Sequence, residues 1–437
     1  KAWGVWWVWD ARLTSSLMLF LIFVAYLLLR QFGGPGSEKL SAGLALFGNY
    51  YVYDSIGPLA EQLSRELGYS DTQIGTLNAI YSVPNIVLVF VGGILVDRYG
   101  PGPVTFWTSV ICLAGAALTA IGTPFALMAA GRLMFGIGAE TMIVATIVAL
   151  GIWFAGRQLA FAMALSISFA RIGSYAVDVS PVWAPGAYAS GWQAPLSLAA
   201  GIMCAGVVAA FLYWRLEASS AARGLQVLGL SRERIELSKL AQFSRGYWYV
   251  LALCVLFYSV IFPFRSTFSI KYFQHTGALS LEAASVLNSY VFLAAVFATP
   301  LFGWMNDRVG RHGLLLTLGA ALLAAAFYVL GATDLSPGVS TALIGVAFSL
   351  VPAVLWPAVT LLEPPQRLGT AYGFMTMVQN IGMAGANFAA GALNDANGAS
   401  AANPAGYLPM IEFFGVLSLL AVAFAALFWR YRARSAS

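Results

Sequence analysis

The feature that most constrains this chain is a series of long apolar runs, each close to the length of a membrane-spanning helix. A helix needs about 20 apolar residues to cross the hydrocarbon core of a bilayer. The 437 residues are 60% hydrophobic and only 9% charged, whereas soluble domains are about one-quarter charged. We therefore predict an all-α polytopic membrane protein. Its expected spans are 13–31, 40–62, 75–96, 103–122, 124–153, 158–181, 194–215, 246–274, 281–305, 312–331, 337–362, 369–392 and 407–431.

The charges between the runs predict which loops share one side of the membrane. Basic residues gather in alternate loops, in the segment 216–245 and in the tail RYRAR, and such loops are cytoplasmic under the positive-inside rule. The expected location is a bacterial inner membrane, with the 216–245 linker and the C-terminus cytoplasmic and the N-terminus periplasmic. Loop arginines account for the formal charge of +5, so the expected partners are lipid and a small-molecule or peptide substrate, without nucleic acid. The sequence identifies no accessory subunit.

An internal repeat divides the chain. GGILVDRYGPGP at 92–103 recurs as FGWMNDRVGRHG at 302–313, which places Asp307 210 residues after Asp97. ARIG at 170–173 recurs 209 residues later as QNIG. Two parallel halves with a substrate site at their interface are typical of secondary transporters. The predicted domains are 1–38, a tryptophan-rich segment with an extra helix; 39–215, the N-terminal half; 216–245, the linker; and 246–437, the C-terminal half.

Several motifs resemble a known family of transporters. G-x-x-x-D-R-x-G after the second helix of each half resembles the signature loop of the major facilitator superfamily. NYYVYDSIGPLAEQL, GRLMFGIGAE, SFARIGS, VLNSYVF and GTAYGFMTMVQNIG resemble, in the same order over about 44–430, the lysosomal dipeptide uniporter branch. The resemblance implies the major facilitator fold, with two pseudo-symmetric six-helix halves, here preceded by one extra N-terminal transmembrane helix. It also implies passage of small peptides by alternating access.

Two charges inside apolar runs are the main candidates for substrate binding. Glu140 and Arg171 lie 16 and 15 residues from Gly156 on helices expected to be antiparallel, which gives them similar depth. A charge at mid-helix is costly and usually serves a transport pathway or a partner. The pair can bind the ammonium and carboxylate ends of a zwitterion, because the planar guanidinium binds both carboxylate oxygens. A structural salt bridge is the alternative from the residues alone; the resemblance implies contact with the peptide termini.

Neutral groups of the second half complete the expected substrate site. Gln379 and Asn380 occupy the repeat position of Arg171, and Asn288 is a further amide in an apolar run, where an unpaired amide is costly. Trp356 and Tyr372 are candidates for a wall of the site, with ordinary helix packing as the alternative.

Charges near helix ends are assigned to the cavity and to a gate. Tyr53, Asp54 and Arg132 are expected to line the cavity; Arg132 has the alternative of capping carbonyl groups or of pairing with Asp54 or Asp178. Four residues of the repeated loops are expected to gate the inner side: Asp97, Arg98, Asp307 and Arg308. Asp97 would accept hydrogen bonds from the N-terminus of the helix that starts near Gly369.

The opening stretch KAWGVWWVWDARLTS raises a different function. It resembles, to about Phe47, the WWD segment of the haem-handling proteins of cytochrome c maturation. Those proteins also use histidines, and this chain has only His275 and His312, neither near the segment. The alternatives are an interfacial aromatic anchor or a fusion fragment.

The expected function is therefore that of a transporter without a cofactor, a metal site or catalytic residues. The sequence shows no nucleophile–base pair, metal cluster or phosphate loop, so an enzyme is not expected. A proton-coupled facilitator for organic anions or amino acids, with Glu140 carrying the proton, is the alternative to peptide transport; a haem-binding maturation component is a more distant one.

Overall fold

The computed structural model describes residues 37–122, 124–153, 159–221, 242–364 and 367–436. Every regular element in these residues is a helix, which confirms the all-α fold class. By length and hydropathy, eight of the described helices qualify as membrane spans, or nine when the two arms of the bent α4 (Asp71–Tyr99) are taken together. The expected extra span at 13–31 lies outside the described residues.

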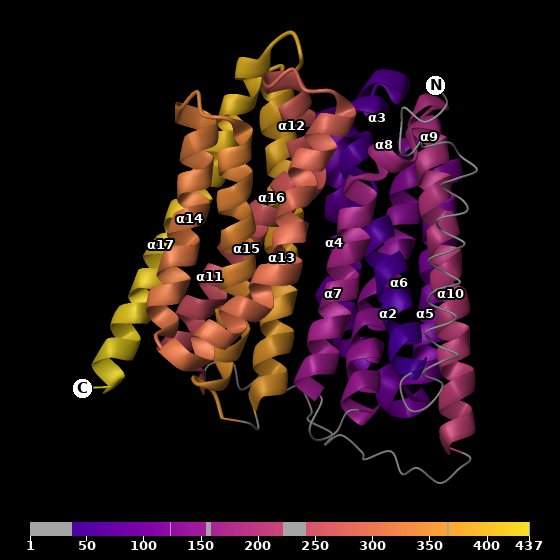
Figure 1. Cartoon of the computed structure of the whole chain (residues 1–437), viewed down its shortest axis with the longest axis vertical. Helices are drawn as coiled ribbons and strands as arrows, with labels where there is room; N and C mark the ends of the chain where they lie inside the picture. The colour runs from indigo at the N-terminus through magenta and orange to yellow at the C-terminus, as the bar shows by residue number, and fades with distance from the viewer. Residues whose placement is uncertain (1–36, 123, 154–158, 222–241, 365–366, 437) are drawn as a thin grey trace, which may run out of the picture.

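The first half of the chain forms a bundle of long helices, indigo to magenta in Figure 1. Besides α4, its long members are α2 (Ser37–Asp54), α5 (Pro101–Ile121), α6 (Phe125–Trp153), α7 (Leu159–Asp178) and α10 (Gln193–Ala221). Short elements lie at one end of this bundle: η1 (Gly57–Leu59), α3 (Ala60–Leu67), α8 (Ser180–Trp183) and α9 (Pro185–Ala189).

The second half forms a matching bundle beside the first, red to yellow in Figure 1. It starts with one continuous rod made of α11 (Arg245–Pro263), the π-helical turn η3 (Phe264–Phe268) and α12 (Ser269–Thr276). The other elements are α13 (Leu281–Val309), α14 (His312–Ala332), α15 (Pro337–Thr360), α16 (Leu368–Ala396), the short η5 (Pro404–Tyr407) and α17 (Leu408–Ala436).

Helix starts and lengths repeat between the halves. Helices α4 and α13 have 29 residues each and start 210 residues apart. Each begins after a serine whose hydroxyl accepts a hydrogen bond from a backbone N–H of the first turn: Gln73 for Ser70 and Ala283 for Ser280. Such caps satisfy a donor that the helix leaves unpaired. Helices α5 and α14 also match, with 21 residues each. The sequence repeat is therefore a repeat of structure.

The halves pack against each other through α4 with α16 and through α7 with α13. Glycines allow the first pair to approach closely. A Cβ atom on Gly75 would lie 2.3 Å from the carbonyl oxygen of Asn387, and one on Gly391 would lie 2.3 Å from that of Asp71. We call the end of the molecule where α10 ends and α11 begins the linker end. The end with α3, α9 and α12 is the opposite end, at the top of Figure 1.

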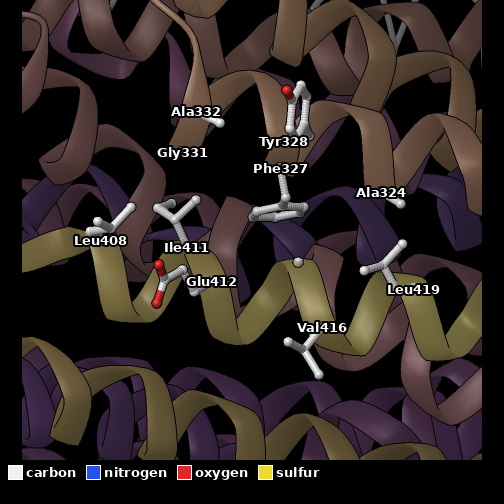
Figure 2. A pocket seen from close by; sticks show the side chains of 11 residues that line it. Ala324, Phe327, Tyr328, Gly331, Ala332, Leu408, Ile411, Glu412, Val416 and Leu419 are labelled. Carbon is white, nitrogen blue, oxygen red and sulfur yellow. The ribbon is translucent and has the colours of Figure 1, made fainter.

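A groove of about 440 Å³ lies on the flank of the C-terminal half, between α14 and α17. Figure 2 shows the mainly apolar side chains that both helices contribute, among them Phe327 and Leu419, and one carboxylate, Glu412. Both helices belong to the same half, and none of the expected substrate residues lines the groove. It is therefore separate from the interface at which a transporter site is expected.

Candidate functional site

Glu140 and Arg171 are charged side chains without a countercharge in contact. Glu140 lies on α6 and Arg171 on α7, and both are half-buried. Neither forms an ion pair or a hydrogen bond with a side chain of the described residues, and they do not pair with each other. Tyr50 on α2 lies close enough to interact electrostatically with both. The described structure thus holds no Glu140–Arg171 salt bridge, and both groups remain available to a ligand.

Arg171 reaches from the N-terminal half to aromatic rings of the C-terminal half. Its guanidinium carbon lies 4.4 Å from the ring centre of Phe348 on α15 and 5.4 Å from that of Phe292 on α13. Both distances are within the range of cation–π attraction. The rings hold the guanidinium at the interface between the halves without occupying its N–H donors.

A group of aromatic side chains from the C-terminal half lies near Arg171. Trp356 donates a hydrogen bond from its indole nitrogen to the hydroxyl of Tyr258, at 3.1 Å. Tyr372 donates to the carbonyl oxygen of Trp356, at 2.9 Å. Tyr258 also stacks on Phe262, with ring centres 5.7 Å apart, and interacts electrostatically with Arg171. Trp356 and Tyr372 therefore belong to one hydrogen-bonded aromatic unit, and Tyr258, which the sequence did not single out, joins them.

The three expected amides have protein partners in this conformation. Asn288 is 2% exposed and lies among Asp178, Arg265 and Ser269, to which all its hydrogen bonds go. Asn380 donates to the carbonyl oxygen of Thr376 in its own helix, and Gln379 accepts a weak bond from the thiol of Cys254. Their contact with substrate stays a prediction.

A buried ion cluster lies between the halves and was not expected as a unit. Arg265, in the π-helical turn η3, is 3.0 Å from Asp54 at the end of α2 and also pairs with Asp178 at the end of α7. None of the three residues is more than 2% exposed. Arg265 lies 20 residues into the apolar run that begins at Arg245, and a charge so deep in a run is the signal that would have identified it.

Arg132 caps backbone carbonyl groups, one of its two expected alternatives. It donates to the carbonyl oxygens of Val52, Tyr53 and Leu77, at 3.0, 3.0 and 3.2 Å, and to the side chain of Asn78 at 2.7 Å. It is 1% exposed and makes no ion pair within the described residues. The ring of Tyr53 packs edge-on against Tyr81, with centres 4.6 Å apart. Arg132 therefore stabilises the end of α2.

Further charges join the two halves at the opposite end. Lys271 on α12 donates to Asp71 at 2.7 Å and to Ser64 at 2.8 Å. The carboxylate of Asp395 on α16 accepts from the backbone N–H groups of Asp71 and Thr72, both at 2.8 Å, so it caps α4 from the other half. Each of these contacts connects the N-terminal half to the C-terminal half.

Glu61 on α3 makes a third link at this end, outside the long helices. His275 lies 2.9 Å from its carboxylate and also contacts the hydroxyl of Tyr407 at 2.7 Å; Lys271 is 3.7 Å from the same carboxylate. Burial alone would raise the pKa of Glu61. The hydrogen bond with His275 and the positive charge of Lys271 outweigh burial, so the pKa lies below its ordinary value of 4.5.

The expected gate residues lie at the linker end and are exposed: Asp97, Arg98, Asp307 and Arg308. Arg98 lies over the ring of Tyr99 and Arg308 over that of Trp304. Asp97 forms no hydrogen bond or ion pair within the described residues, so its expected contact with the start of α16 is not made in this conformation. That contact stays a prediction for another conformation. In this conformation, ion pairs and hydrogen bonds therefore join the halves at the opposite end, and the expected contact of Asp97 at the linker end is not formed.

Comparison with known proteins agrees with this architecture. A model of the Major Facilitator Superfamily matches residues 42–387 and 266–437, and a model of the Cytochrome C assembly protein family matches residues 1–52. The lysosomal dipeptide transporter MFSD1 of Danio rerio is 32% identical over 402 residues, covering 88% of this chain and 85% of that protein. The one of Mus musculus is 33% identical over 392 residues, covering 86% and 82%.

A solved structure gives the same result for the fold. A bacterial homologue of the human lysosomal transporter Spinster superposes with a TM-score of 0.74 at 13% identity, covering 91% of this chain and 97% of that one. Four observations lead to the same assignment: apolar helices, paired halves, a matching family model and relatives that are themselves transporters. The chain is an integral membrane protein and belongs to the major facilitator superfamily.

Proposed function

We propose that this protein moves small peptides with free termini across a membrane by alternating access. The observation that carries the proposal is the pair Glu140 and Arg171: opposite charges, half-buried, near the interface of the halves and without a countercharge in contact among the described residues. The relatives named as dipeptide transporters support the substrate class.

The chemistry assigns each charge to one terminus of the peptide. Glu140 accepts hydrogen bonds from the terminal ammonium group, and Arg171 donates two parallel bonds to the terminal carboxylate. The rings of Phe292 and Phe348 restrict the guanidinium, so less of its freedom is lost when the peptide binds. The aromatic unit of Tyr258, Trp356 and Tyr372 offers an apolar wall with a few polar atoms to the side chains of the peptide.

Alternating access requires the halves to separate at the opposite end and to close at the linker end. The links of Arg265, Lys271, His275 and Asp395 to the N-terminal half would break in that change. Asp97 would then reach the N-terminus of α16, where the backbone N–H groups favour a carboxylate. We place the linker end in the cytoplasm of a bacterial cell, because the basic loops gather there.

The test is a cross of two variants with three ligands, read out as the rise in melting temperature of the purified protein. Wild type should respond to a dipeptide and respond less to its N-acetyl and C-amide derivatives. Glu140→Gln should lose its discrimination against the N-acetyl derivative only, and Arg171→Gln its discrimination against the amide only. Loss of discrimination at the other terminus, or wild-type behaviour in both variants, would contradict the assignment.

A carrier for organic anions is the second candidate, because no described residue pairs its charge with Arg171, which can hold a carboxylate alone. In that case Glu140 would oppose the ligand, and Glu140→Gln would strengthen the thermal response to organic anions. Adding anions and free amino acids to the same screen separates the two functions.

The match of residues 1–52 to the Cytochrome C assembly protein family leaves a haem function to test. We propose that residues 1–38 are separable from transport. Their deletion should leave the dipeptide response in place. A haem absorption band that follows the purified full chain and disappears with the deletion would contradict this reading.

A further inference from the structure

The ion cluster of Asp54, Asp178 and Arg265 contains two acids and one base. The guanidinium of Arg265 contacts both carboxylates, and the three residues are 1–2% exposed. No donor among the described residues makes a well-directed hydrogen bond to either carboxylate oxygen of Asp54, and the Nε of Arg265 has no acceptor there. Counted by direct contact, the cluster carries one uncompensated negative charge.

The other groups around the cluster do not supply the missing positive charge by contact. On α6, Arg132 donates to carbonyl oxygens and to Asn78, and on α7, Arg171 lies over aromatic rings. Neither forms an ion pair with Asp54 or Asp178 within the described residues. The remaining groups that face the two acids are neutral in their ordinary state: Tyr50 and Tyr53 on α2, Tyr188 on α9 and Asn288 on α13.

We infer that Asp54 and Asp178 form a shared proton-binding site, filled when the opposite end is closed and emptied when it opens. An ionised carboxylate that leaves water without a partner is strongly disfavoured, and taking up a proton removes the charge. The proton passes from water to one carboxylate oxygen, and nothing else is exchanged. Because the two acids share one guanidinium, the proton belongs to the pair and is not assigned to one residue.

The placement of the three residues couples this proton to conformation. Asp54 and Asp178 belong to the N-terminal half, and Arg265 belongs to the C-terminal half. Separation of the halves at this end, which the proposed alternating access requires, withdraws Arg265 and lets water reach both acids. Both carboxylates then ionise. Closure takes up one proton from the solution at the opposite end, so acid there favours the closed conformation.

Asn288 distinguishes the two acids, because it hydrogen-bonds Asp178 and not Asp54. Its amide nitrogen donates to Asp178 at 3.1 Å and to the backbone carbonyl of Arg265 at 3.2 Å, while its oxygen accepts from Ser269. Both ends of the amide are therefore hydrogen-bonded, and the carboxylate of Asp178 accepts one of these bonds. The oxygens of Asp54 receive no directed hydrogen bond from the described residues.

The experiment measures the closed fraction of the whole protein against pH, without peptide. Spin labels on cysteines placed at the exposed Ser190 and Ala401, in a Cys204→Ser background, report the distance between the halves at the opposite end. Over about pH 5 to 8, the ratio of closed to open molecules should fall by up to tenfold per pH unit in wild type, the slope for one proton. Asp54→Asn and Asp178→Asn, which imitate the protonated acid, should each stay closed and lose that slope.

Two matched variants test titratable groups outside the cluster, Glu140 in the proposed substrate site and His275 at the closed end. Glu140→Gln and His275→Gln should keep the wild-type slope. Loss of the slope in either of them, retention of it in both aspartate variants, or a single distance at every pH would overturn the inference. Because no peptide is present, failure of the dipeptide assay leaves this result unaffected, so the two proposals fail separately.

Discussion

Two arginines of the N-terminal half, Arg132 and Arg171, show that the same residue type serves different purposes according to what it touches. Arg132 directs its donors to three carbonyl oxygens and one amide oxygen. Arg171 lies against two aromatic rings, and its donors have no acceptor among the residues that the structure describes. Both sit within apolar runs, so the sequence alone does not separate them, because the groups they meet come from other helices.

Replacing each arginine by methionine should therefore have opposite effects on stability and binding. Arg132→Met removes four buried hydrogen bonds, at about 0.5–1.5 kcal/mol for each bond, and should lower the melting temperature by several degrees. Arg171→Met removes a charge without a countercharge and should leave the melting temperature unchanged or raise it, while it abolishes the thermal response to dipeptides. Thermal unfolding of the two variants side by side checks this; equal losses of stability would contradict it.

The sequence singles out charges that stand alone in apolar runs, and it does not reveal partnerships between charges that are far apart in the chain. Glu140 and Arg171 were recognisable as costly charges. Arg265 directly follows the apolar stretch VIFPF at 260–264, but its partner Asp178 lies 87 residues away, and no local pattern connects them. Asn288 was expected to face substrate because an unpaired amide in an apolar run is costly; its partners in the ion cluster come from distant parts of the chain.

At the scale of elements, long helices follow from the sequence and their irregularities do not. The expected span 281–305 falls within Leu281–Val309, and the expected span 103–122 nearly coincides with Pro101–Ile121. The run 246–274 was expected as one helix, whereas the structure inserts the π-helical turn η3 after Pro263. A π-helical turn forms where tertiary contacts stabilise an extra residue in the turn, and here that turn carries Arg265.

The close approach of α4 and α16 leads to a prediction with an internal control. A Cβ atom on Gly75 would lie 2.3 Å from the backbone oxygen of Asn387, whereas one on Gly93 of the same helix meets nothing within 4 Å. Such overpacking costs about 1–3 kcal/mol, so Gly75→Ala should reduce the closed-to-open ratio at the opposite end by about five- to 150-fold. Gly93→Ala should leave the label distances unchanged, and an equal effect of both variants would refute the packing argument.

Glu61 gives a prediction that depends on pH. Its pKa is lowered in the folded protein, so its stabilising contribution is fully present above the ordinary value of 4.5 and is lost as the pH falls through the lowered pKa. Glu61→Gln should therefore melt below wild type at neutral pH, and the difference should vanish in acid. Glu66→Gln is the control, because the hydrogen bonds of Glu66 stay within its own half, at Gln62, Arg65 and Trp192. It should not change the distance between the halves.

At the scale of the whole molecule, the fold is encoded redundantly and the conformation is not. Apolar runs predict the long helices and the 210-residue repeat predicts two matching halves, and the structure agrees with both. Which end is closed depends on a small free-energy difference between two arrangements of the same helices. That difference sums contacts between residues far apart in the chain, such as Asp395 with the start of α4. Sequence patterns predict the helices of each half, but they do not predict this free-energy difference.

The pseudo-symmetry of the halves finally predicts what closes the linker end. Helix α4 packs on α16 and α13 packs on α7, so Asp97 and Asp307, which end equivalent helices, face the starts of α16 and α7 when that end closes. A carboxylate at a helix N-terminus contributes about 0.3–1 kcal/mol, so Asp97→Asn and Asp307→Asn should each shift the closed-to-open ratio at the linker end by about two- to fivefold. Both side chains are exposed in the present conformation. Neither variant should therefore have a lower melting temperature than wild type. Spin-label distances at the linker end test the shift in ratio, and thermal unfolding tests the stability. A loss of stability without a shift in distance would show that the two aspartates act within their own halves.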